Sequence, residues 1–433
     1  MSRTVGPDRV VVINDDAVER GGAAAIALAG ARLVAARGIP VTFLSGSDEI
    51  APDLAAGGIT TGVLGGRQLL ERGRLSAAAS GLYDARTKTA LARWIDAHDT
   101  PRTVYHLHNW HKVLSPSAFV ALRPIAARLV MSAHDFFLAC PNGAYFHYPR
   151  QHECDLVPNG AACVATACDR RHYAHKLWRV ARHGLRHRLF DLTASEARVI
   201  AVHEAMVPLL TRGPIAPDCI RVLRNPVTPW RPTRVAAENN RDIFFVGRLD
   251  GDKGAHLLAH AARRVGARLR LIGDGPLAAE IAEICPTAEF LGWRRRDEIS
   301  ELVSSARLVV SPTVNREPFG LVALEALMSG IPVIVAQSSP FADEIVDRQL
   351  GLAGNPHNER ALAGAIATLL RDDLLVRRMS CRAVAEARRL APTPAQWCDR
   401  LLALYAERLG DPIAPHDESA AVAPASIEAA GDG

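Results

Sequence analysis

The chain is short of aromatic side chains and of long apolar runs. Phe, Trp and Tyr together make up 5% of its 433 residues, while 48% are hydrophobic and 22% are charged. Residues 1–7 contain no apolar signal core. The alanine-rich run 21–36 is interrupted by Arg32 and falls short of the roughly 20 apolar residues that a membrane span requires. These absences argue against a membrane-spanning or disordered chain and predict a globular protein in the cytoplasm.

A disulfide framework is not expected, because cytoplasmic thiols stay reduced. Half of the eight cysteines nevertheless fall in one stretch that is rich in Gly and Pro, namely Cys140, Cys154, Cys163 and Cys168. Four thiolates can close a tetrahedral zinc site and so order a segment with little periodicity of its own. The intervals of 13, 8 and 4 residues are not those of a zinc ribbon. A structural zinc ion is therefore one interpretation of this cluster, and buried free thiols or another redox arrangement are the alternatives.

Acidic residues are missing between Arg170 and Arg188, where seven Lys or Arg and four His are interleaved with apolar residues at helical spacing. This pattern fits either a solvated helix with a packed apolar face or an interfacial helix held to an anionic membrane. Nucleic acid is not an expected partner, because no nucleic-acid-binding module accompanies the charge. The segment 411–433 has five acids and no Lys or Arg, and we expect it to be disordered.

Short β-branched runs alternate with helical patterns, which predicts an α/β protein with parallel sheets covered by helices. The expected strands are 10–13, 41–44, 103–107, 128–132, 243–246, 269–272, 308–311 and 332–336. Three prolines between Asn225 and Pro232 mark a break between two doubly wound halves. We expect an N-terminal Rossmann-like domain at 1–225 with a cysteine-containing insertion at 140–168. A C-terminal Rossmann-like domain at 226–391 and a helix at 392–410 follow.

Two carboxylates flank a predicted helix start in the second half. Glu317 precedes Pro318, which suits a first helical position, and Glu325 follows Glu317 after seven intervening residues. The free amides at such a helix start bind anions, and the carboxylates can accept hydroxyl groups on either side of the anion. A diphosphate with a sugar on one side and a ribose on the other satisfies these groups. The plainer alternative is that Glu317 interacts only with the helix dipole and that Glu325 is a solvated helix residue.

Arg248 and Lys253 lie beside another predicted helix start. Two cations there match the charge of a diphosphate, and each charge-assisted hydrogen bond contributes about 1.5–3 kcal/mol. Without them, Gly247 would indicate only a tight turn. Gly273 and Gly275 add little by themselves, because the third glycine and the downstream acid of a dinucleotide fingerprint are missing.

Histidines gather in the first half, at His106, His108, His111 and His134. The first three could form a metal group, but no set of carboxylates accompanies them, so polar residues at a strand edge are the simpler interpretation. His134 follows a predicted strand at its carboxyl end, where α/β sheets bind ligands. Asp135 could orient His134 or cap the next segment.

Together these segments resemble the retaining glycosyltransferases of family 4, which have the GT-B fold of two Rossmann-like domains facing a central cleft. The stretch from Glu317 to Glu325 is similar to the family's Glu-x7-Glu motif. Segment 246–254 resembles its phosphate-binding turn, 271–276 its nucleotide-side loop and 223–226 its interdomain segment. Segments 14–22, 106–111 and 133–135 fit its acceptor-domain pattern. The resemblance covers about residues 9–408 and is more specific in the second half.

The resemblance implies transfer of a hexose-type unit from a nucleoside diphosphate sugar to an acceptor hydroxyl, with retention at the anomeric carbon. Arg248 and Lys253 would neutralise the leaving diphosphate, and Glu317 would position the sugar. Glu325 would hold the ribose, and His134 would stabilise the reacting sugar. Further donor contacts are expected at Gly21, Gly22, Gly273, Phe319, Gly320 and Leu321.

No protein nucleophile is evident, and none is needed if the leaving phosphate assists a front-face reaction, so no cofactor is expected for the chemistry. The helix at 392–410 would return to the first domain, as in family members. A saccharide or lipid-linked saccharide acceptor is expected, in cell-surface polysaccharide or glycolipid assembly. The enzyme would then work as a peripheral protein on the inner face of the plasma membrane. The alternatives are a nucleotide-sugar hydrolase or epimerase and a binding adaptor without catalysis.

Overall fold

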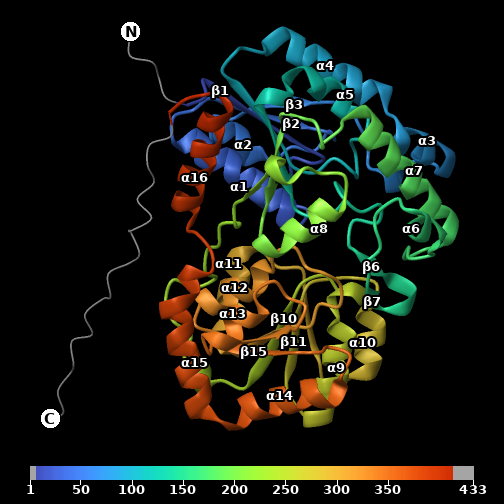
Figure 1. The fold of residues 1–433 in the computed structure, drawn as a ribbon. Helices are drawn as coiled ribbons and strands as arrows, with labels where there is room; N and C mark the ends of the chain where they lie inside the picture. Colours follow the sequence, from blue (N-terminus) through green and yellow to red (C-terminus); the bar gives the residue numbers. More distant parts are fainter. Residues whose placement is uncertain (1–5, 413–433) are drawn as a thin grey trace.

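Two parallel β-sheets divide the structure, a computed structural model that describes residues 6–412, into two lobes, one above the other in Figure 1. The seven strands of the first sheet lie in the order β3 (Thr60–Val63), β2 (Val41–Ser45), β1 (Arg9–Asn14), β4 (Thr103–Leu107), β5 (Leu129–Ala133), β8 (Arg198–Ala201) and β9 (Ile220–Val222). The six strands of the second lie in the order β12 (Glu289–Gly292), β11 (Leu269–Ile272), β10 (Asp242–Val246), β13 (Ala306–Ser311), β14 (Val333–Ala336) and β15 (Gly351–Gly354).

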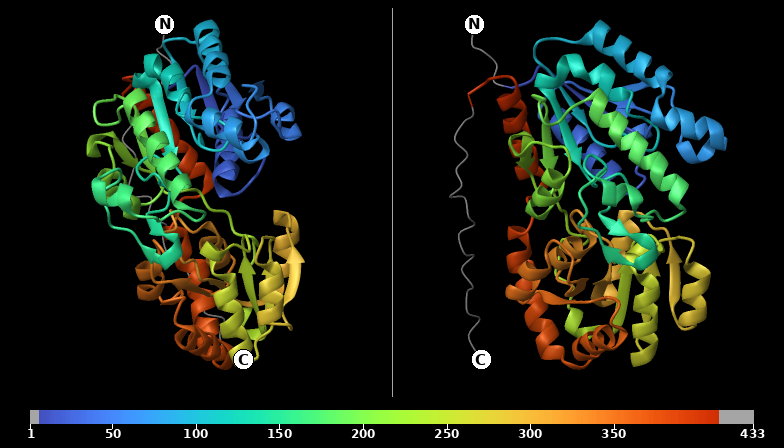
Figure 2. Two further views of the ribbon diagram at one scale, coloured as in Figure 1. Left: turned by 90° about the vertical axis from the view of Figure 1, so that its right-hand side faces the viewer. Right: turned by 45° about the vertical axis from the view of Figure 1, so that its right-hand side comes forward.

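Helices pack on both sheets (Figures 1 and 2). The upper lobe contains α1 (Gly22–Ala36), α2 (Pro52–Ala56), α3 (Arg74–Leu82), α4 (Ala85–His98), α5 (Ala118–Leu122), α6 (Ala161–Ala165), α7 (Tyr173–Leu189) and α8 (Val207–Arg212). The lower lobe contains α9 (Ala255–Val265), α10 (Ala278–Ile284), α11 (Arg296–Leu302), α12 (Leu321–Met328), α13 (Ala342–Asp347), α14 (Glu359–Arg371) and α15 (Asp373–Glu386). A two-stranded antiparallel hairpin of β6 (Phe146–His147) and β7 (His152–Glu153) lies at the junction of the lobes.

The central strands are apolar on both faces because helices cover both faces. Val10, Val11 and Ile13 of β1 have no exposed surface, and neither have Ile243 and Phe244 of β10. Burial on both sides is what a continuous β-branched or aromatic run requires, and it explains why these segments pair in parallel. All ladders in the two large sheets are parallel, as the sequence predicted.

The order of the strands fixes where ligands are expected. In the first sheet the chain leaves β1 toward β2 on one side, while β4 pairs with the other side of β1. The second sheet repeats this arrangement with β10 between β11 and β13. Open α/β sheets bind ligands outside the carboxyl ends of strands at such a reversal. The segments that follow β1, β4, β10 and β13 are therefore the candidates for the functional site.

The last helix, α16 (Pro394–Arg408), packs beside α1 in the upper lobe (Figure 1). A Cβ atom at Gly30 of α1 would lie 3.0 Å from the indole of Trp397, so the two helices approach closely. The Tyr405 hydroxyl lies 2.6 Å from His106 Nδ1 on β4. The last helix of the described residues thus packs against the first lobe, although the domain limits given above stay predictions.

The α/β class with two doubly wound parallel sheets is confirmed, and all eight predicted strands are present. Five further strands of these sheets were not foreseen: β3, β8, β9, β12 and β15. The acidic segment predicted to be disordered lies, beyond Pro412, outside the described residues.

Candidate functional site

The turn after β10 carries both predicted cations. Lys253 Nζ lies 2.7 Å from Glu317 Oε1, which joins the turn to the loop before α12. Arg248 has 66% of its side chain exposed and pairs with Asp250. The structure therefore brings Lys253 and Glu317 together at the end of the second sheet and leaves Arg248 at the surface beside them.

Glycines allow the loops after β10, β11 and β13 to touch. Gly254 has a φ of +69°, and a Cβ atom there would lie 2.1 Å from the carbonyl oxygen of Pro312. Gly273 has a φ of +131°, and its Cβ atom would lie 2.0 Å from the carbonyl oxygen of Gly247. No side chain fits at either position. The predicted nucleotide-side loop at Gly273 is thus packed directly on the predicted phosphate-binding turn.

The helix that carries Glu325 begins later than predicted. α12 starts at Leu321, and its N-cap is Gly320 with φ 90° and ψ 49°. This left-handed conformation cannot continue a helix, so the expected start at Pro318 is wrong. The helix has eight residues, and Glu325 lies one turn inside it rather than two. No side chain of the described chain caps the helix start, so its first amides remain open to a ligand.

Glu325 is paired with an arginine that sequence reasoning did not single out. Arg296 Nη1 lies 2.6 Å from Glu325 Oε1, and Arg296 also donates to the carbonyl oxygens of Thr228 and Pro229. Burial raises the pKa of Glu325, and the Arg296 guanidinium opposes this shift. The available signal was the run of three arginines, 294–296, that follows β12.

Phe319 is buried and does not present its ring to a ligand. Only 3% of its surface is exposed. Its ring packs edge-on against Phe341, with centroids 5.1 Å apart, and lies near His203. A donor contact at Phe319 could come only from its backbone, whereas Leu321 is partly exposed at the start of α12.

The start of α1 faces the start of α12 from the other lobe. A Cβ atom at Gly22 would lie 3.2 Å from Leu321 Cδ1. Gly21, the N-cap of α1, has a φ of +111° and nothing within 4 Å of its would-be Cβ atom. Two helix N-termini thus meet where the lobes meet, and both direct their positive dipole ends toward the same region.

His134 follows β5 and belongs to a buried group of histidines. His134 Nε2 lies 2.8 Å from His108 Nδ1, and the two rings are stacked. His106 stacks on His108 and bonds to Tyr405 and Ser132. Burial lowers the pKa of His134 to about 4, so its ring is neutral near pH 7. It can exchange hydrogen bonds with a sugar but does not supply a positive charge there.

Asp135 caps the segment that follows it. Its Oδ1 accepts a hydrogen bond of 2.9 Å from the Phe137 amide, and its other oxygen lies 3.7 Å from His111 Nδ1. Burial raises the pKa of Asp135 to about 6. Of the two roles considered for Asp135, the contacts correspond to the cap, because the hydrogen-bond partner of His134 is His108.

Another carboxylate, Asp15 after β1, is buried and was not predicted. It accepts hydrogen bonds from the backbone amides of Lys112, Val113 and Leu114 at 2.8, 3.0 and 2.8 Å. Asp15 therefore holds the loop after β4 that carries His111. The signal was its place at the carboxyl end of the first predicted strand.

The zinc prediction for Cys140, Cys154, Cys163 and Cys168 is not supported. Within residues 6–412, no group of three or more His, Cys, Asp or Glu is placed to hold a metal ion. The thiols have other partners: Lys176 Nζ donates to Cys163 Sγ at 3.1 Å, and Asn142 Nδ2 lies 3.3 Å from Cys168 Sγ. Cys140 Sγ in turn donates to Asn142 Oδ1. Three of the four thiols are thus hydrogen-bonded to neighbouring side chains.

The basic helix is for the most part not a cationic surface. Lys176, Arg182 and Arg186 of α7 are buried. Arg182 donates to the carbonyl oxygens of Gly81, His111 and Leu114, and so ties α7 to the neighbouring loops. Arg171 and Arg188 remain exposed at its ends. In the described part of the chain, no helix is long and apolar enough to cross a membrane.

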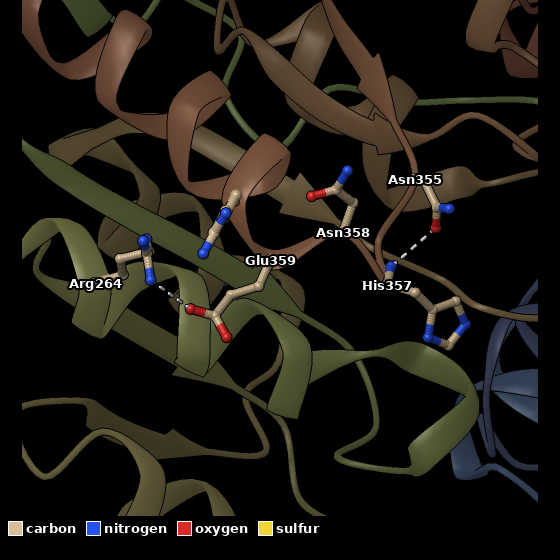
Figure 3. A pocket seen from close by; sticks show the side chains of 6 residues that line it. Arg264, Asn355, His357, Asn358 and Glu359 are labelled. Carbon is tan, nitrogen blue, oxygen red and sulfur yellow. Dashed lines mark hydrogen bonds and ion pairs between the residues drawn. The ribbon is translucent and has the colours of Figure 1, made fainter.

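One hollow in the described surface lies away from these residues. It measures about 500 Å³ and is open to solvent, between the end of α9 and the start of α14 (Figure 3). Its lining consists of Arg264, Asn355, His357, Asn358, Glu359 and Arg360. None of these is a predicted site residue, and Arg264 and Glu359 already form an ion pair. We therefore place the candidate site at the junction of the lobes.

Known proteins resemble this chain in sequence and in fold. Residues 227–386 match the family model for Glycosyl transferases group 1. Residues of this chain are 27% identical over 277 positions to glycogen synthase of Mycobacterium tuberculosis, which covers 60% of this chain and 64% of that protein. They are 36% identical over 173 positions to D-inositol 3-phosphate glycosyltransferase of Corynebacterium glutamicum, which covers 36% of this chain and 41% of that protein. In neither case does the match reach two thirds of the relative's length.

Solved structures match over almost the whole chain. Anabaena HepE in complex with UDP superposes with a TM-score of 0.64 and 18% identity, covering 93% of this chain and 99% of that one. Sucrose-phosphate synthase of Thermosynechococcus elongatus gives a TM-score of 0.68 and 17% identity over the same shares. At this identity the likeness establishes the fold alone. The chain has the GT-B fold, and its second lobe carries a group 1 glycosyltransferase domain.

Proposed function

We propose that the protein is a retaining glycosyltransferase of family 4 that moves a sugar from a nucleoside diphosphate sugar to an acceptor hydroxyl. The observation that carries the proposal is the meeting of Lys253 and Glu317 beside the uncapped start of α12, opposite the start of α1. A diphosphate needs fixed positive charge, and a sugar needs a carboxylate that accepts its hydroxyls. The Lys253–Glu317 ion pair contains both a positive charge and a carboxylate.

When the donor binds, its groups replace contacts that the site residues make with one another. The diphosphate takes the ammonium of Lys253 and the amides of residues 320–322, and exposed Arg248 closes on it from solvent. Glu317, released from Lys253, accepts hydroxyl groups of the sugar. Glu325 accepts the ribose hydroxyls while Arg296 keeps its charge balanced. In this arrangement the carboxylates corresponding to the Glu-x7-Glu motif lie on the two sides of the diphosphate.

The leaving group is the centre of the mechanism. Departure of the diphosphate concentrates negative charge on its outer oxygens, and Lys253, Arg248 and the dipole of α12 stabilise that charge in place. The same departing oxygen accepts the proton of the acceptor hydroxyl, which attacks from the same face and retains the anomeric configuration. His134, as a neutral ring on the other lobe, hydrogen-bonds the sugar as it reacts. The proposed chemistry needs no protein nucleophile.

A panel of donors tests the proposal. Anabaena HepE has been solved with UDP and with UDP-glucose, so UDP-sugars are the first donors to examine. GDP, ADP and dTDP sugars follow, each with saccharide and lipid-linked saccharide acceptors, and products are identified by mass spectrometry. An acceptor-linked sugar with the donor's anomeric configuration supports the proposal. An inverted product, or binding of none of the nucleoside diphosphates, contradicts it.

The two alternatives give different products. A hydrolase or epimerase of the same fold releases free sugar or an epimer of the donor without any acceptor. An adaptor binds without turnover and has no use for Lys253, Glu317 and Arg296 in their present arrangement. Acceptor dependence of donor consumption separates these cases in one assay.

We further propose that the acceptor is a lipid-linked saccharide of cell-surface polysaccharide or glycolipid assembly, reached on the inner face of the plasma membrane. Fewer exposed cations are available for membrane binding than the sequence indicated. They lie at the ends of α7, and Tyr173 and Leu177 are exposed between them. Sedimentation with anionic vesicles should therefore weaken in Arg171→Gln/Arg188→Gln and in high salt. Equal sedimentation with neutral and anionic vesicles contradicts this part of the proposal.

A further inference from the structure

The segment 140–170, which includes the cysteines and the β6–β7 hairpin, reaches from the first lobe onto the second. Arg170 Nη2 lies 3.0 Å from Asp252 Oδ2. Arg316 Nη2 lies 2.6 Å from Glu153 Oε2 and 3.2 Å from Asp155 Oδ1. These three ion pairs join this segment, called the clamp segment below, to loops of the second sheet. Figure 1 shows the hairpin beside the second lobe.

Apolar packing accompanies the charges. Phe146 and Ala144 of the clamp segment form a buried cluster with Val314 of the second lobe, and Tyr148 and Leu257 pack at its edge. The guanidinium of Arg170 lies 4.6 Å from the centre of the Tyr148 ring. The clamp segment therefore contacts the second lobe through a packed apolar surface as well as through three ion pairs.

The residues that the clamp segment contacts are neighbours of the proposed donor-binding side chains. Asp252 precedes Lys253, and Arg316 precedes Glu317. The two loops are themselves joined, because the Val314 amide donates to the Asp252 carbonyl oxygen at 2.9 Å. The clamp segment thus holds both loops at the position where their next side chains form the Lys253–Glu317 pair.

The other side of the clamp segment is fastened firmly to the first lobe. Tyr145 donates from its hydroxyl to the Leu209 carbonyl oxygen at 2.8 Å. Asp169, which is buried, binds His175 and Arg179 of α7 at 3.0 and 3.2 Å. Lys176 of α7 donates to Cys163. Hydrogen bonds and ion pairs therefore fasten the segment to the first lobe, whereas ion pairs and apolar packing join it to the second lobe.

We propose that residues 140–170 act as an interdomain clamp, and that Arg170, Glu153 and Asp155 are positioning residues for the donor site. Through Asp252 and Arg316 they hold the loops of Lys253 and Glu317 in register with each other and with the first lobe. The clamp-segment member of each ion pair is exposed, so water can take its place while the clamp opens to admit a donor and closes again around it. The effect of the clamp on catalysis rests on the proposed function, whereas its effect on the positions of the two loops does not.

Hydrogen exchange in the ligand-free protein tests the structural part. We expect backbone amides at 250–254 and 313–317 to exchange roughly tenfold faster in Arg170→Gln/Glu153→Gln/Asp155→Asn, because the loops lose their tie to the first lobe. The matched control is Glu359→Gln, which removes an exposed ion pair with Arg264 of the second lobe and should leave these amides unchanged. Arg170→Lys alone should keep most of the protection, because it keeps the charge. Unchanged exchange in the triple variant overturns the clamp, whatever the donor is.

Steady-state kinetics with UDP-glucose as the probe tests the positioning part. The triple variant should lose kcat by about tenfold or more, with a smaller rise in KM and an unchanged melting temperature. Glu359→Gln should retain wild-type kinetics. Faster loop exchange combined with wild-type kcat overturns the positioning role, even if the protein proves to be a transferase. If wild-type protein neither binds UDP nor turns over any donor, the proposed function fails while the exchange result still decides the clamp.

Discussion

The charged side chains of the proposed donor site are paired with one another before a ligand arrives. Lys253 holds Glu317, Arg296 holds Glu325 and Arg248 holds Asp250. An unpaired charge in a partly buried site would be costly, so these pairs keep the ligand-free site stable. Each pair also keeps its members close to where a diphosphate, a sugar and a ribose would use them. Donor binding then requires small exchanges of partners rather than new folding.

The first prediction concerns the leaving group. Lys253→Ala should reduce kcat/KM by about 2–3 kcal/mol of transition-state stabilisation, or roughly a hundredfold, because the departing diphosphate loses a fixed counter-charge. Arg248→Ala should also reduce it, but less, because Arg248 is 66% exposed. Transfer kinetics on the chosen donor measure both, with Arg264→Ala as a control far from the site. Wild-type kinetics in folded Lys253→Ala would remove Lys253 from the mechanism.

The second prediction separates the two glutamates. Glu325→Gln should weaken UDP binding, because the amide is a poorer acceptor for the ribose hydroxyls and Arg296 is left without its carboxylate. Glu317→Gln should spare UDP affinity and lose turnover, because UDP carries no sugar for Glu317 to hold. Calorimetric titration with UDP, followed by turnover assays, distinguishes the two. The opposite pattern would mean that the donor lies in the reverse orientation.

The pairing of these residues could not have been read from local patterns. Lys253 and Glu317 each stand in a recognisable motif, but 64 residues separate them. Arg296 lies 29 residues before Glu325 in a run of arginines that by itself indicates only a charged surface. Only the packing of three loops, through Gly254 and Gly273, brings these positions together. The residue types were predictable, and their partners were not.

At the scale of elements, the predictable strands are those buried on both faces. Eight runs of Val, Ile, Leu and Phe were recognised because continuous apolar character is what a central parallel strand needs. The five others have four residues or fewer. β3 and β15 contain glycine, and β12 begins with Glu289. β3, β9, β12 and β15 are the outermost strands of their sheets, and pairing with one neighbour, rather than composition, makes them strands.

The start of α12 was likewise not predictable from local sequence preference. Pro318 is a common first residue of helices, and this favoured a start there. The chain instead turns through a left-handed Gly320, which directs Glu317 toward Lys253 and leaves the amides of α12 uncovered. A local preference for helix was thus overridden by a turn that the site uses.

The third prediction concerns the turn that carries Lys253. Gly254→Ala should lower stability by roughly 3 kcal/mol or more, because the left-handed conformation and the contact with Pro312 both oppose a side chain. Gly266→Ala is the matched control: Gly266 has a φ of +64°, but nothing lies within 4 Å of its would-be Cβ atom. It should cost only about 1 kcal/mol. Melting temperatures from calorimetry compare the two, and equal losses would show that the close approach to Pro312 has no effect on stability.

At the scale of the whole molecule, the two sheets lie in separate lobes that several segments connect. The clamp segment crosses beside the donor loops, and α16 returns to α1 on another side (Figure 2). The strand order reverses at β1 and at β10, so the loops that follow these strands begin at the junction of the lobes. Fold class followed from alternation of strand and helix patterns, but these crossings depend on tertiary contacts alone.

Burial of histidines in the first lobe links the stability of the whole molecule to pH. Burial lowers the pKa of His134 to about 4 and that of His106 to about 3, and it lowers the pKa of His108 as well. Their ordinary value in an unfolded chain is about 6.5. Unfolding therefore takes up protons between these values. The stabilising contribution is complete above about pH 6.5 and is lost progressively as the pH falls toward 4.

The fourth prediction follows from this difference in proton binding. The melting temperature of the wild-type protein should fall between pH 6.5 and pH 4, and His134→Gln should reduce the steepness of that fall by up to one proton per molecule. His172→Gln, at an exposed position, should leave the steepness unchanged. Calorimetry at closely spaced pH values gives the slopes directly, and a uniform loss of stability in His134→Gln does not affect the comparison. A slope as steep as that of the wild type would mean that folding does not lower the pKa of His134.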